Sequence, residues 1–301
     1  MRRPGAPQQV PRLVAPNARP AMGDPNAEYA LIAGTGFSDL APGEPREINT
    51  PYGAAHIVEA HAGEQPIIFL PRHGPGHTVL PHQVNYRANI WALRSLGVRR
   101  VLATASVGGI NKQMQPGEFA LLTQFLDFTR CRPATFFDQV GSTAMHVDMS
   151  DPYCPSLRRA LTRAGEALGI AIHPAATYVC TEGPRFETPA EIHAFDVLGA
   201  DVVGMTGVPE APLAREANLC YASVAIITNW AAGVSAAPVS HQEVLDAMRD
   251  QQARVWRLLT DAIARHRVAR SRSDRHGGPQ GLATDPEPCS CAQAVDEALW
   301  R

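Results

Sequence analysis

The central part of the chain alternates short apolar runs with longer stretches in which apolar residues recur every three or four positions. Short apolar runs bounded by turn residues are typical of buried β-strands, and the longer period is typical of amphipathic helices. Because the two patterns alternate without an internal repeat, we predict one α/β domain. The strands are expected at 29–33, 66–70, 100–107, 119–125, 175–180, 201–205 and 221–228.

The expected helices carry signals at their ends. The first two stop at a glycine, which ends helices readily because it adopts a left-handed backbone conformation. The last two begin at a Ser or Thr that stands three positions before a glutamate, which is the capping-box pattern. The four helices are expected at 84–96, at 157–168, after Thr188 and after Ser240.

Both ends of the chain differ from the centre in composition. Residues 1–27 are rich in Pro, Arg and Ala, and residues 267–301 contain the polar run R-S-R-S-D-R-H-G-G-P-Q-G with few large apolar side chains. Segments of this kind bury too little apolar surface to offset the entropy of ordering, so we predict two flexible tails. The folded domain is therefore expected at 28–266.

The overall charge and hydrophobicity exclude several kinds of partner. A net charge of -2 provides no positive field that would gather nucleic acid or an acidic membrane surface. No apolar run approaches the length of a membrane span, and the N-terminus lacks the apolar segment of a secretory leader. The composition therefore predicts a cytoplasmic protein that binds neither nucleic acid nor membrane.

The six cysteines fall into two groups. Four stand in apolar or loop contexts, where free thiols in a reducing compartment are expected: Cys131, Cys154, Cys180 and Cys220. Cys289 and Cys291 form a C-x-C pair in the C-terminal tail, which is compatible with a redox pair, half of a tetrahedral metal site or two exposed thiols. Because no second Cys/His pair follows to complete a metal shell, we favour exposed thiols and predict no bound metal.

Polar or small residues follow six of the predicted strands. After the first strand, Gly34-Thr35-Gly36 forms either a phosphate-binding turn or a simple tight turn, since the third glycine of a dinucleotide motif is missing. Arg72 and His73 follow the second strand, and an Arg fork beside a His offers hydrogen-bond donors to an anion. Because ligands collect at strand ends in open α/β sheets, we favour an anion site here over solvated surface residues.

The remaining strand ends add further candidates. The run 105–109 ends the third strand in small residues whose turn could donate backbone N–H groups to the same anion. Glu187 lies just before a helix start, where it either interacts with the helix dipole or belongs to a site. Residues 205–206 and Asn229 end two more apolar strands. Packing alone does not explain six polar or small strand ends, so the sequence predicts a binding site where these ends meet.

Several segments resemble the phosphorylases of purine nucleosides, of the trimeric type that includes 5'-methylthioadenosine phosphorylase and the 6-oxopurine-specific enzymes. The resemblance covers nearly all of 29–265 and neither tail. The matching segments are A-G-T-G-F at 33–37, T-P-Y-G at 50–53, R-H-G-P-G-H and V-N-Y-R-A-N-I-W-A-L between 72 and 93, G-P-R-F-E-T at 183–188, G-A-D-V-V-G-M-T-G-V-P-E at 199–210 and T-N-W-A-A-G at 228–233.

This resemblance implies a single domain with a central mixed β-sheet flanked by helices. It also implies an enzyme that cleaves the N-glycosidic bond with inorganic phosphate as co-substrate, without cofactor, metal or covalent intermediate, giving a purine base and a sugar 1-phosphate. Catalysis would rest on positioning and electrostatics more than on acid–base chemistry. The chain would assemble into a homotrimer or homohexamer.

The resemblance also assigns roles to individual residues. Arg72, Glu187 and Asn229 would be the catalytic residues. Phosphate would be held by Thr35, Arg72, His73, Ala105, Ser106 and Thr206, and the nucleoside by Phe186, Glu187, Met205, Asn229, Ala231 and His241. One departure is Ala105, where the methylthioadenosine enzymes tend to have Thr, so that a hydroxyl contact is lost while the Ser106 backbone can still donate.

Three positions discriminate between substrates. The 6-aminopurine enzymes that resemble this chain carry Asp in place of Asn229, and an amide can donate to O6 or N7 where a carboxylate would face a lone pair. Glu187 can accept the N1–H of a 6-oxopurine, and His241 can bond a 5'-hydroxyl or act only as a neighbour of the helix cap. We therefore predict a 6-oxopurine nucleoside phosphorylase in purine salvage.

Two alternatives stay open. A methylthioinosine phosphorylase is supported by the likeness to the methylthio branch and opposed by His241. A purine nucleoside binding protein without activity would be expected to lose Arg72 or the donors around it, and this chain retains them.

Overall fold

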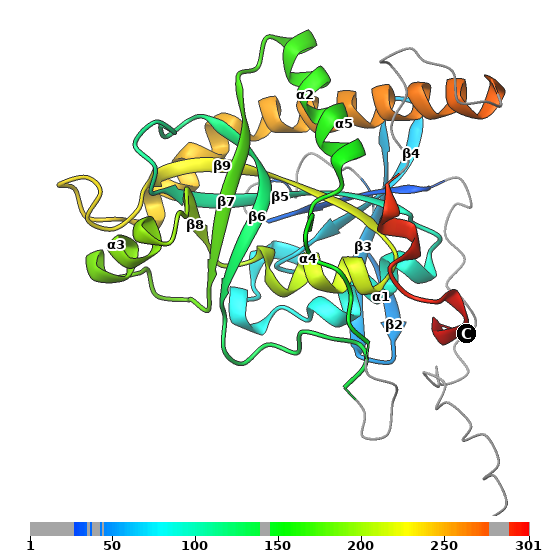
Figure 1. Ribbon diagram of the computed structural model, residues 1–301, viewed down its shortest axis with the longest axis horizontal. Helices are drawn as coiled ribbons and strands as arrows, with labels where there is room; N and C mark the ends of the chain where they lie inside the picture. Colours follow the sequence, from blue (N-terminus) through cyan, green and yellow to red (C-terminus); the bar gives the residue numbers. More distant parts are fainter. Residues whose placement is uncertain are drawn as a thin grey trace, which may run out of the picture.

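The computed structural model describes residues 27–34, 37, 43, 45–138, 145–276 and 289–300, with the backbone alone at 241 and 272–276. Its nine strands form one mixed sheet in the order β2-β3-β4-β1-β5-β8-β7-β6-β9. Strand β9 also pairs with β5, so that β5, β8, β7, β6 and β9 close into a ring (Figure 1). The strands are β1 (Tyr29–Ala33), β2 (Pro45–Thr50), β3 (Gly53–Ala62), β4 (Gln65–Pro71), β5 (Arg100–Gly109), β6 (Phe119–Phe128), β7 (Ile172–Thr181), β8 (Val202–Gly204) and β9 (Cys220–Trp230).

Four neighbouring strands point the same way. Strand β1 pairs in parallel with β4 and β5, and β5 pairs in parallel with β9. The carboxyl ends of these strands therefore meet at one edge, where the sequence placed most of the candidate site residues. The single domain with a mixed sheet is confirmed.

Helices cover both faces of the sheet. Alternate residues of β1 face opposite sides, so that Ala30 and Ile32 pack with α1 and α4 while Tyr29 and Leu31 pack with α2 and α5. Figure 1 shows α2 and α5 above the sheet and α1 and α4 below it. The longer helices are α1 (Tyr86–Ser95), α2 (Pro155–Leu168), α3 (Pro189–Val197), α4 (Gly207–Glu216) and α5 (His241–His276).

The helix signals of the sequence are confirmed. Gly169 ends α2 in the left-handed conformation, and Thr188 and Glu191 form the predicted capping box of α3. The Ser240 side chain accepts from the Glu243 N–H at 3.1 Å at the start of α5. Three elements have no counterpart in the prediction: the hairpin β2–β3, whose strands carry polar residues on an exposed face, and α4, which contains Pro212.

The predicted C-terminal tail differs from the structure. Helix α5 continues to His276 instead of ending near 266, and residues 289–300 pack against the domain. Cys291 and Val295 are only 2% and 4% exposed, and Cys289 is half-buried, so the expectation of two exposed thiols is wrong. The segment is polar overall, and so its composition does not reveal that a few of its side chains are buried against the domain. The other tail was expected at 1–27; residues 1–26 lie outside the described residues, and Ala27 is buried in the core.

Within the described ranges, none of the helices combines the length and the apolar character that a membrane span requires.

Candidate active site

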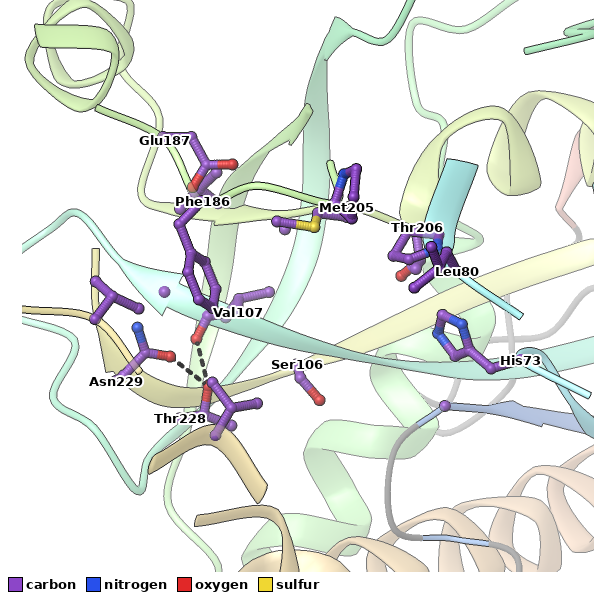
Figure 2. A pocket seen from close by; sticks show the side chains of 18 of the residues that line it. His73, Leu80, Ser106, Val107, Phe186, Glu187, Met205, Thr206, Thr228 and Asn229 are labelled. Atoms are coloured by element: carbon purple, nitrogen blue, oxygen red, sulfur yellow. Dashed lines mark hydrogen bonds between the residues drawn. The ribbon is translucent and has the colours of Figure 1, made fainter. Parts of the chain in front are cut away.

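A cavity of about 440 Å³ lies where the carboxyl ends of β1, β4, β5 and β9 meet. The connections after β7 and β8 complete its wall. Figure 2 shows Glu187 and Asn229 at one end, His73 and Thr206 at the other, and Ser106 between them. Nine of the twelve predicted site residues line this cavity: Arg72, His73, Ser106, Phe186, Glu187, Met205, Thr206, Asn229 and Ala231.

The Arg72 guanidinium is held in place by the protein. Its Nε and Nη2 donate to the two carboxylate oxygens of Glu210 at 2.7 Å each, and Nη1 donates to the Thr104 carbonyl at 2.9 Å. Burial works to lower the pKa of Arg72, but the charge and hydrogen bonds of Glu210 raise it above its ordinary value. One N–H on each terminal nitrogen is left for a ligand, so Arg72 offers an anion an oriented pair of donors instead of its full fork.

His73 is a hydrogen-bond acceptor toward the cavity. Its Nδ1 lies 2.8 Å from the Val79 carbonyl, and because a carbonyl only accepts, Nδ1 carries the proton. Burial and the neighbouring Arg72 lower the pKa of His73 to about 4, so the ring is neutral at pH 7. Nε2, which lies beside Gly34, is therefore unprotonated. The prediction of a second donor to an anion is corrected: His73 donates only after it takes up a proton.

The predicted turn at 105–109 is part of strand β5. Ala105 and Ser106 pair with Ala225 and Ile226 of β9, and the strand continues to Gly109 beyond its predicted end at 107, so the expected turn is extended strand. Ala105 is 2% exposed in the core and does not line the cavity. The reason is the alternation of a strand, which turns successive residues to opposite faces.

Ser106 remains at the cavity. The Thr104 carbonyl points toward Arg72, and because backbone groups two residues apart in a strand point the same way, the Ser106 N–H faces that side too. The Ser106 hydroxyl donates to Met248 Sδ at 3.0 Å. A thioether is a weak acceptor, so this hydroxyl can turn to a better one.

A buried tyrosine positions the loop that carries Met205 and Thr206. The Tyr178 hydroxyl accepts from the N–H groups of Thr206 and Gly207 at 3.0 and 3.2 Å. A Cβ at position 207 would lie 2.8 Å from the Tyr178 ring, so the backbone can come this close only as glycine. The Met205 thioether packs against Gly183, which has φ of 66°.

The Asn229 amide has one fixed orientation. Nδ2 donates to the Trp230 carbonyl at 2.8 Å, and Oδ1 accepts from the Thr228 hydroxyl at 2.7 Å. A flipped amide would oppose two oxygens at Trp230, so the nitrogen must stand there. Asn229 is 4% exposed, and one Nδ2 hydrogen and one lone pair of Oδ1 remain for a ligand. The side chain can thus donate one hydrogen bond and accept one.

Glu187 is a half-buried acid at the same end. The Thr181 hydroxyl donates to its Oε1 at 2.6 Å. Burial raises the pKa of Glu187 above its ordinary value, although this hydrogen bond opposes the shift. The Phe186 ring lies between Glu187 and Asn229 in Figure 2, so a flat, partly apolar ligand with polar edges fits this end of the cavity.

Two predicted site residues lie wholly or partly outside the described residues. Thr35 lies outside the described residues, and so does the side chain of His241, whose backbone begins α5. The wall near the start of α5 is formed by Val239 and Val244.

Sequence reasoning missed the residues that orient the site. These are Glu210 for Arg72, Thr228 for Asn229 and Thr181 for Glu187. Glu210 is 0% exposed in an apolar stretch, and a glutamate in such a stretch signals a buried cationic partner. The two threonines give no comparable signal, because threonine is ordinary in strands.

Comparisons with known proteins agree with this geometry. A profile of the Phosphorylase superfamily matches residues 27–264. The chain is 49% identical over 241 residues to the 6-oxopurine nucleoside phosphorylase of Pyrococcus furiosus, covering 78% of this chain and 91% of that protein. It is 44% identical over 272 residues to a probable S-methyl-5'-thioinosine phosphorylase of Methanopyrus kandleri, covering 90% and 98%. The methylthioadenosine phosphorylase of Schistosoma mansoni in complex with adenine matches with a TM-score of 0.75 at 35% identity, covering 79% of this chain and 91% of that one.

Proposed function

This chain belongs to the phosphorylase superfamily, and we propose that it cleaves 6-oxopurine nucleosides such as inosine and guanosine with inorganic phosphate. The products are the free base and ribose 1-phosphate, as purine salvage requires. Inorganic phosphate is a co-substrate, and the reaction needs no cofactor. The observation that carries this proposal is the fixed Asn229 amide, which presents a donor to the base.

The base pole of the site consists of Asn229 and Glu187. The free Nδ2 hydrogen of Asn229 donates to O6 or N7, where negative charge grows as the glycosidic bond breaks. Glu187 accepts the N1–H that 6-oxopurines carry and adenine lacks, and its bond from Thr181 keeps Oε1 oriented. A mispaired buried group on either side costs about 1 to 3 kcal/mol, which makes this selection steep.

The phosphate pole consists of Arg72, His73, Ser106 and Thr206, and the G-T-G motif of the sequence assigns Thr35 to it as well. Arg72 supplies two oriented N–H groups, and the Ser106 N–H and the two hydroxyls supply more. Neutral His73 accepts a hydrogen bond from a phosphate O–H, which both H2PO4⁻ and HPO4²⁻ carry. These groups hold the nucleophile against C1' of a ribose that becomes oxocarbenium-like.

The ribose lies between the two poles in this proposal. Met205 packs under the sugar, Phe186 covers the sugar and base, and Ala231 leaves room beside Asn229. Because both poles are oriented by buried partners, little reorganisation is needed when charge develops. The rate enhancement then comes from position and electrostatics.

A second candidate is methylthioinosine, because Val239 and Val244 give the wall near α5 an apolar character that suits a 5'-thioether. The likeness to a probable S-methyl-5'-thioinosine phosphorylase points the same way. His241, at the start of α5, favours a 5'-hydroxyl instead. We keep the 6-oxopurine as the shared conclusion, since both candidates contain it.

The test is a phosphate-dependence assay over inosine, guanosine, methylthioinosine and methylthioadenosine. We expect turnover of the 6-oxopurine substrates only with phosphate, and a higher kcat/KM for inosine than for methylthioinosine. Equal cleavage of methylthioadenosine would contradict the base assignment, turnover without phosphate would indicate a hydrolase, and a preference for the thioether would reassign the 5' pocket.

We also propose that the enzyme acts in the cytoplasm as a homotrimer or homohexamer. The exposed apolar residues Phe128, Val197 and Leu198 support a self-association surface, since Val197 is 73% exposed and Phe128 contacts Phe195 of α3. Light scattering on the purified chain gives the number of subunits, and a monomer would overturn this assembly.

A further inference from the structure

Four cysteines that lie far apart in the sequence meet at one point of the fold. Cys154 precedes α2, Cys220 begins β9, and Cys289 and Cys291 come from the C-terminal segment 289–300. Their four Sγ atoms all lie within 4.8 Å of one another, and Cys220 Sγ is 3.2 Å from Cys289 Sγ. Three of the four side chains are buried and Cys289 is half-buried, so the thiols converge in the interior.

We propose that these four cysteines bind one zinc ion, which clasps the C-terminal segment to the domain. Four thiolates at zinc–sulfur bonds of about 2.3 Å stand about 3.8 Å apart at the corners of a tetrahedron. This value lies between the 3.2 Å that separates the Cys220 and Cys289 sulfurs and the 4.8 Å within which all four sulfurs lie. A disulfide would instead draw two sulfurs to about 2 Å. A closed set of four thiolates is typical of structural zinc sites.

The surroundings favour thiolates in this place. Cys154 is the N-cap of α2, a helix of 14 residues, and the positive end of the helix dipole stabilises a nearby negative charge. The nearby His266 is not a ligand, because its Nδ1 is bonded to the Tyr29 hydroxyl at 2.9 Å and its Nε2 to the Ser156 hydroxyl at 3.0 Å. When zinc binds, four S–Zn bonds form, four S–H protons leave to the buffer and nothing is oxidised.

The proposed zinc site accounts for the order of the polar segment 289–300. Beyond the cysteines, the Asn218 side chain makes two hydrogen bonds to the Val295 backbone: Nδ2 donates to the carbonyl at 2.7 Å, and Oδ1 accepts from the N–H at 2.8 Å. Glu297 accepts a hydrogen bond from Arg94 at 2.6 Å, and the Arg94 guanidinium lies over the Trp300 ring in a cation–π contact. Figure 1 shows this segment in red on the side of the molecule opposite α3. A metal at its beginning would hold the whole segment against the domain.

The site is separate from the cavity. Cys220 is the first residue of β9 and Asn229 stands near its other end, so about 30 Å of extended strand lies between them. Zinc here is therefore structural and takes no part in the proposed reaction. Its presence or absence can be tested without any assay of activity.

The test uses the full chain, produced with zinc in the medium and purified with a thiol reductant and without chelator. Elemental analysis should find about one zinc per chain. The double variant Cys289→Ser, Cys291→Ser should lose it, whereas Cys131→Ser, at an exposed cysteine outside the cluster, should retain it. Removing zinc from the unaltered chain with a chelator should lower its Tm by several degrees, because metal binding stabilises only the folded state.

A second measurement keeps the test independent of how the double variant folds. Cobalt(II) bound to the unaltered chain should give the thiolate charge-transfer band and the visible bands of a tetrahedral four-sulfur site. The proposal would be overturned if the chain contained no metal while all six thiols could be titrated. It would also be overturned if the mass of the chain were lower by the four hydrogens that two disulfides remove. Iron instead of zinc would overturn the choice of metal, and zinc retained by the double variant would overturn the ligand set.

Discussion

Asn229→Asp replaces one nitrogen by oxygen and tests both functions of this side chain. In the folded protein Nδ2 donates to the Trp230 carbonyl at 2.8 Å, and the side chain is 4% exposed. The variant opposes two oxygens at this point and buries a carboxyl group. An unsatisfied buried polar group costs about 1 to 3 kcal/mol, which is the fall that we expect in the free energy of unfolding.

Activity should fall further than stability. The variant loses a hydrogen bond to a base that gains negative charge, worth about 1.5 to 3 kcal/mol, and adds a repulsion of similar size between the carboxylate and O6. A total of about 3 to 6 kcal/mol lowers kcat/KM for inosine by roughly two hundred- to twenty-thousand-fold. Burial raises the pKa of the new carboxyl, and its protonated form can donate, so part of the activity should return as the pH falls.

The assay is phosphorolysis of inosine between about pH 5 and 8, alongside denaturant unfolding at each pH. Asn229→Ala is the matched control, because it removes the donor without adding a charge. It should lose less activity at neutral pH, and its loss relative to the unaltered enzyme should vary little with pH. If Asn229→Asp keeps its inosine kcat/KM within about tenfold at neutral pH, or if the two variants share one pH profile, the role of the amide is refuted.

Three further outcomes are expected. Glu210→Gln leaves the Arg72 charge buried without its partner, so denaturant unfolding should show a loss of about 3 to 5 kcal/mol, and a loss under 1 would contradict the ion-pair argument. Burial lowers the pKa of His266 to about 4, so between about pH 6.5 and 4 this side chain binds a proton only in the unfolded state. The free energy of unfolding should therefore fall as the pH falls, by about 1.4 kcal/mol per pH unit. His266→Asn should flatten that slope in denaturation measured as a function of pH. Because the pKa of His73 is lowered to about 4, its ring stays a neutral acceptor for the O–H of either H2PO4⁻ or HPO4²⁻, so titration of His73 should add no step to the KM for phosphate between about pH 5 and 8; a step at about pH 6.5 that His73→Asn removes would sink this arrangement.

The sequence predicted the parallel part of the fold because its strands are continuously apolar. β1 is buried at all five positions and β9 at ten of eleven, which the hydrophobic pattern reveals directly. Strand β2 of the hairpin has one buried residue, and the buried residues of β3 are interrupted by exposed or partly exposed ones, as in an edge hairpin, so the pattern is easily confused with a loop. Helix α4 was not predicted because its prolines are typical of helix breaks.

The candidate site was predictable where strand ends carry unusual residues. Arg72, Glu187 and Asn229 all follow apolar runs, and the parallel sheet brings them to one cavity. The register inside a strand was not predictable, because a shift of one residue turns a side chain to the other face. That is why Ala105 was expected at the phosphate and lies in the core.

The cysteine cluster shows a limit of reading motifs along the chain. Metal sites are recognised in sequences by pairs of ligands at short spacing, and among the cysteines only Cys289 and Cys291 form such a pair. The other pair is made by the fold: the Cys154 N–H donates to the Tyr221 carbonyl at 2.7 Å, which fixes the start of α2 beside the start of β9 and so brings Cys154 to Cys220. A backbone contact, which leaves no trace in side-chain identity, completes a set of four ligands. The expectation of exposed thiols was therefore wrong because the second half of the site exists only in three dimensions.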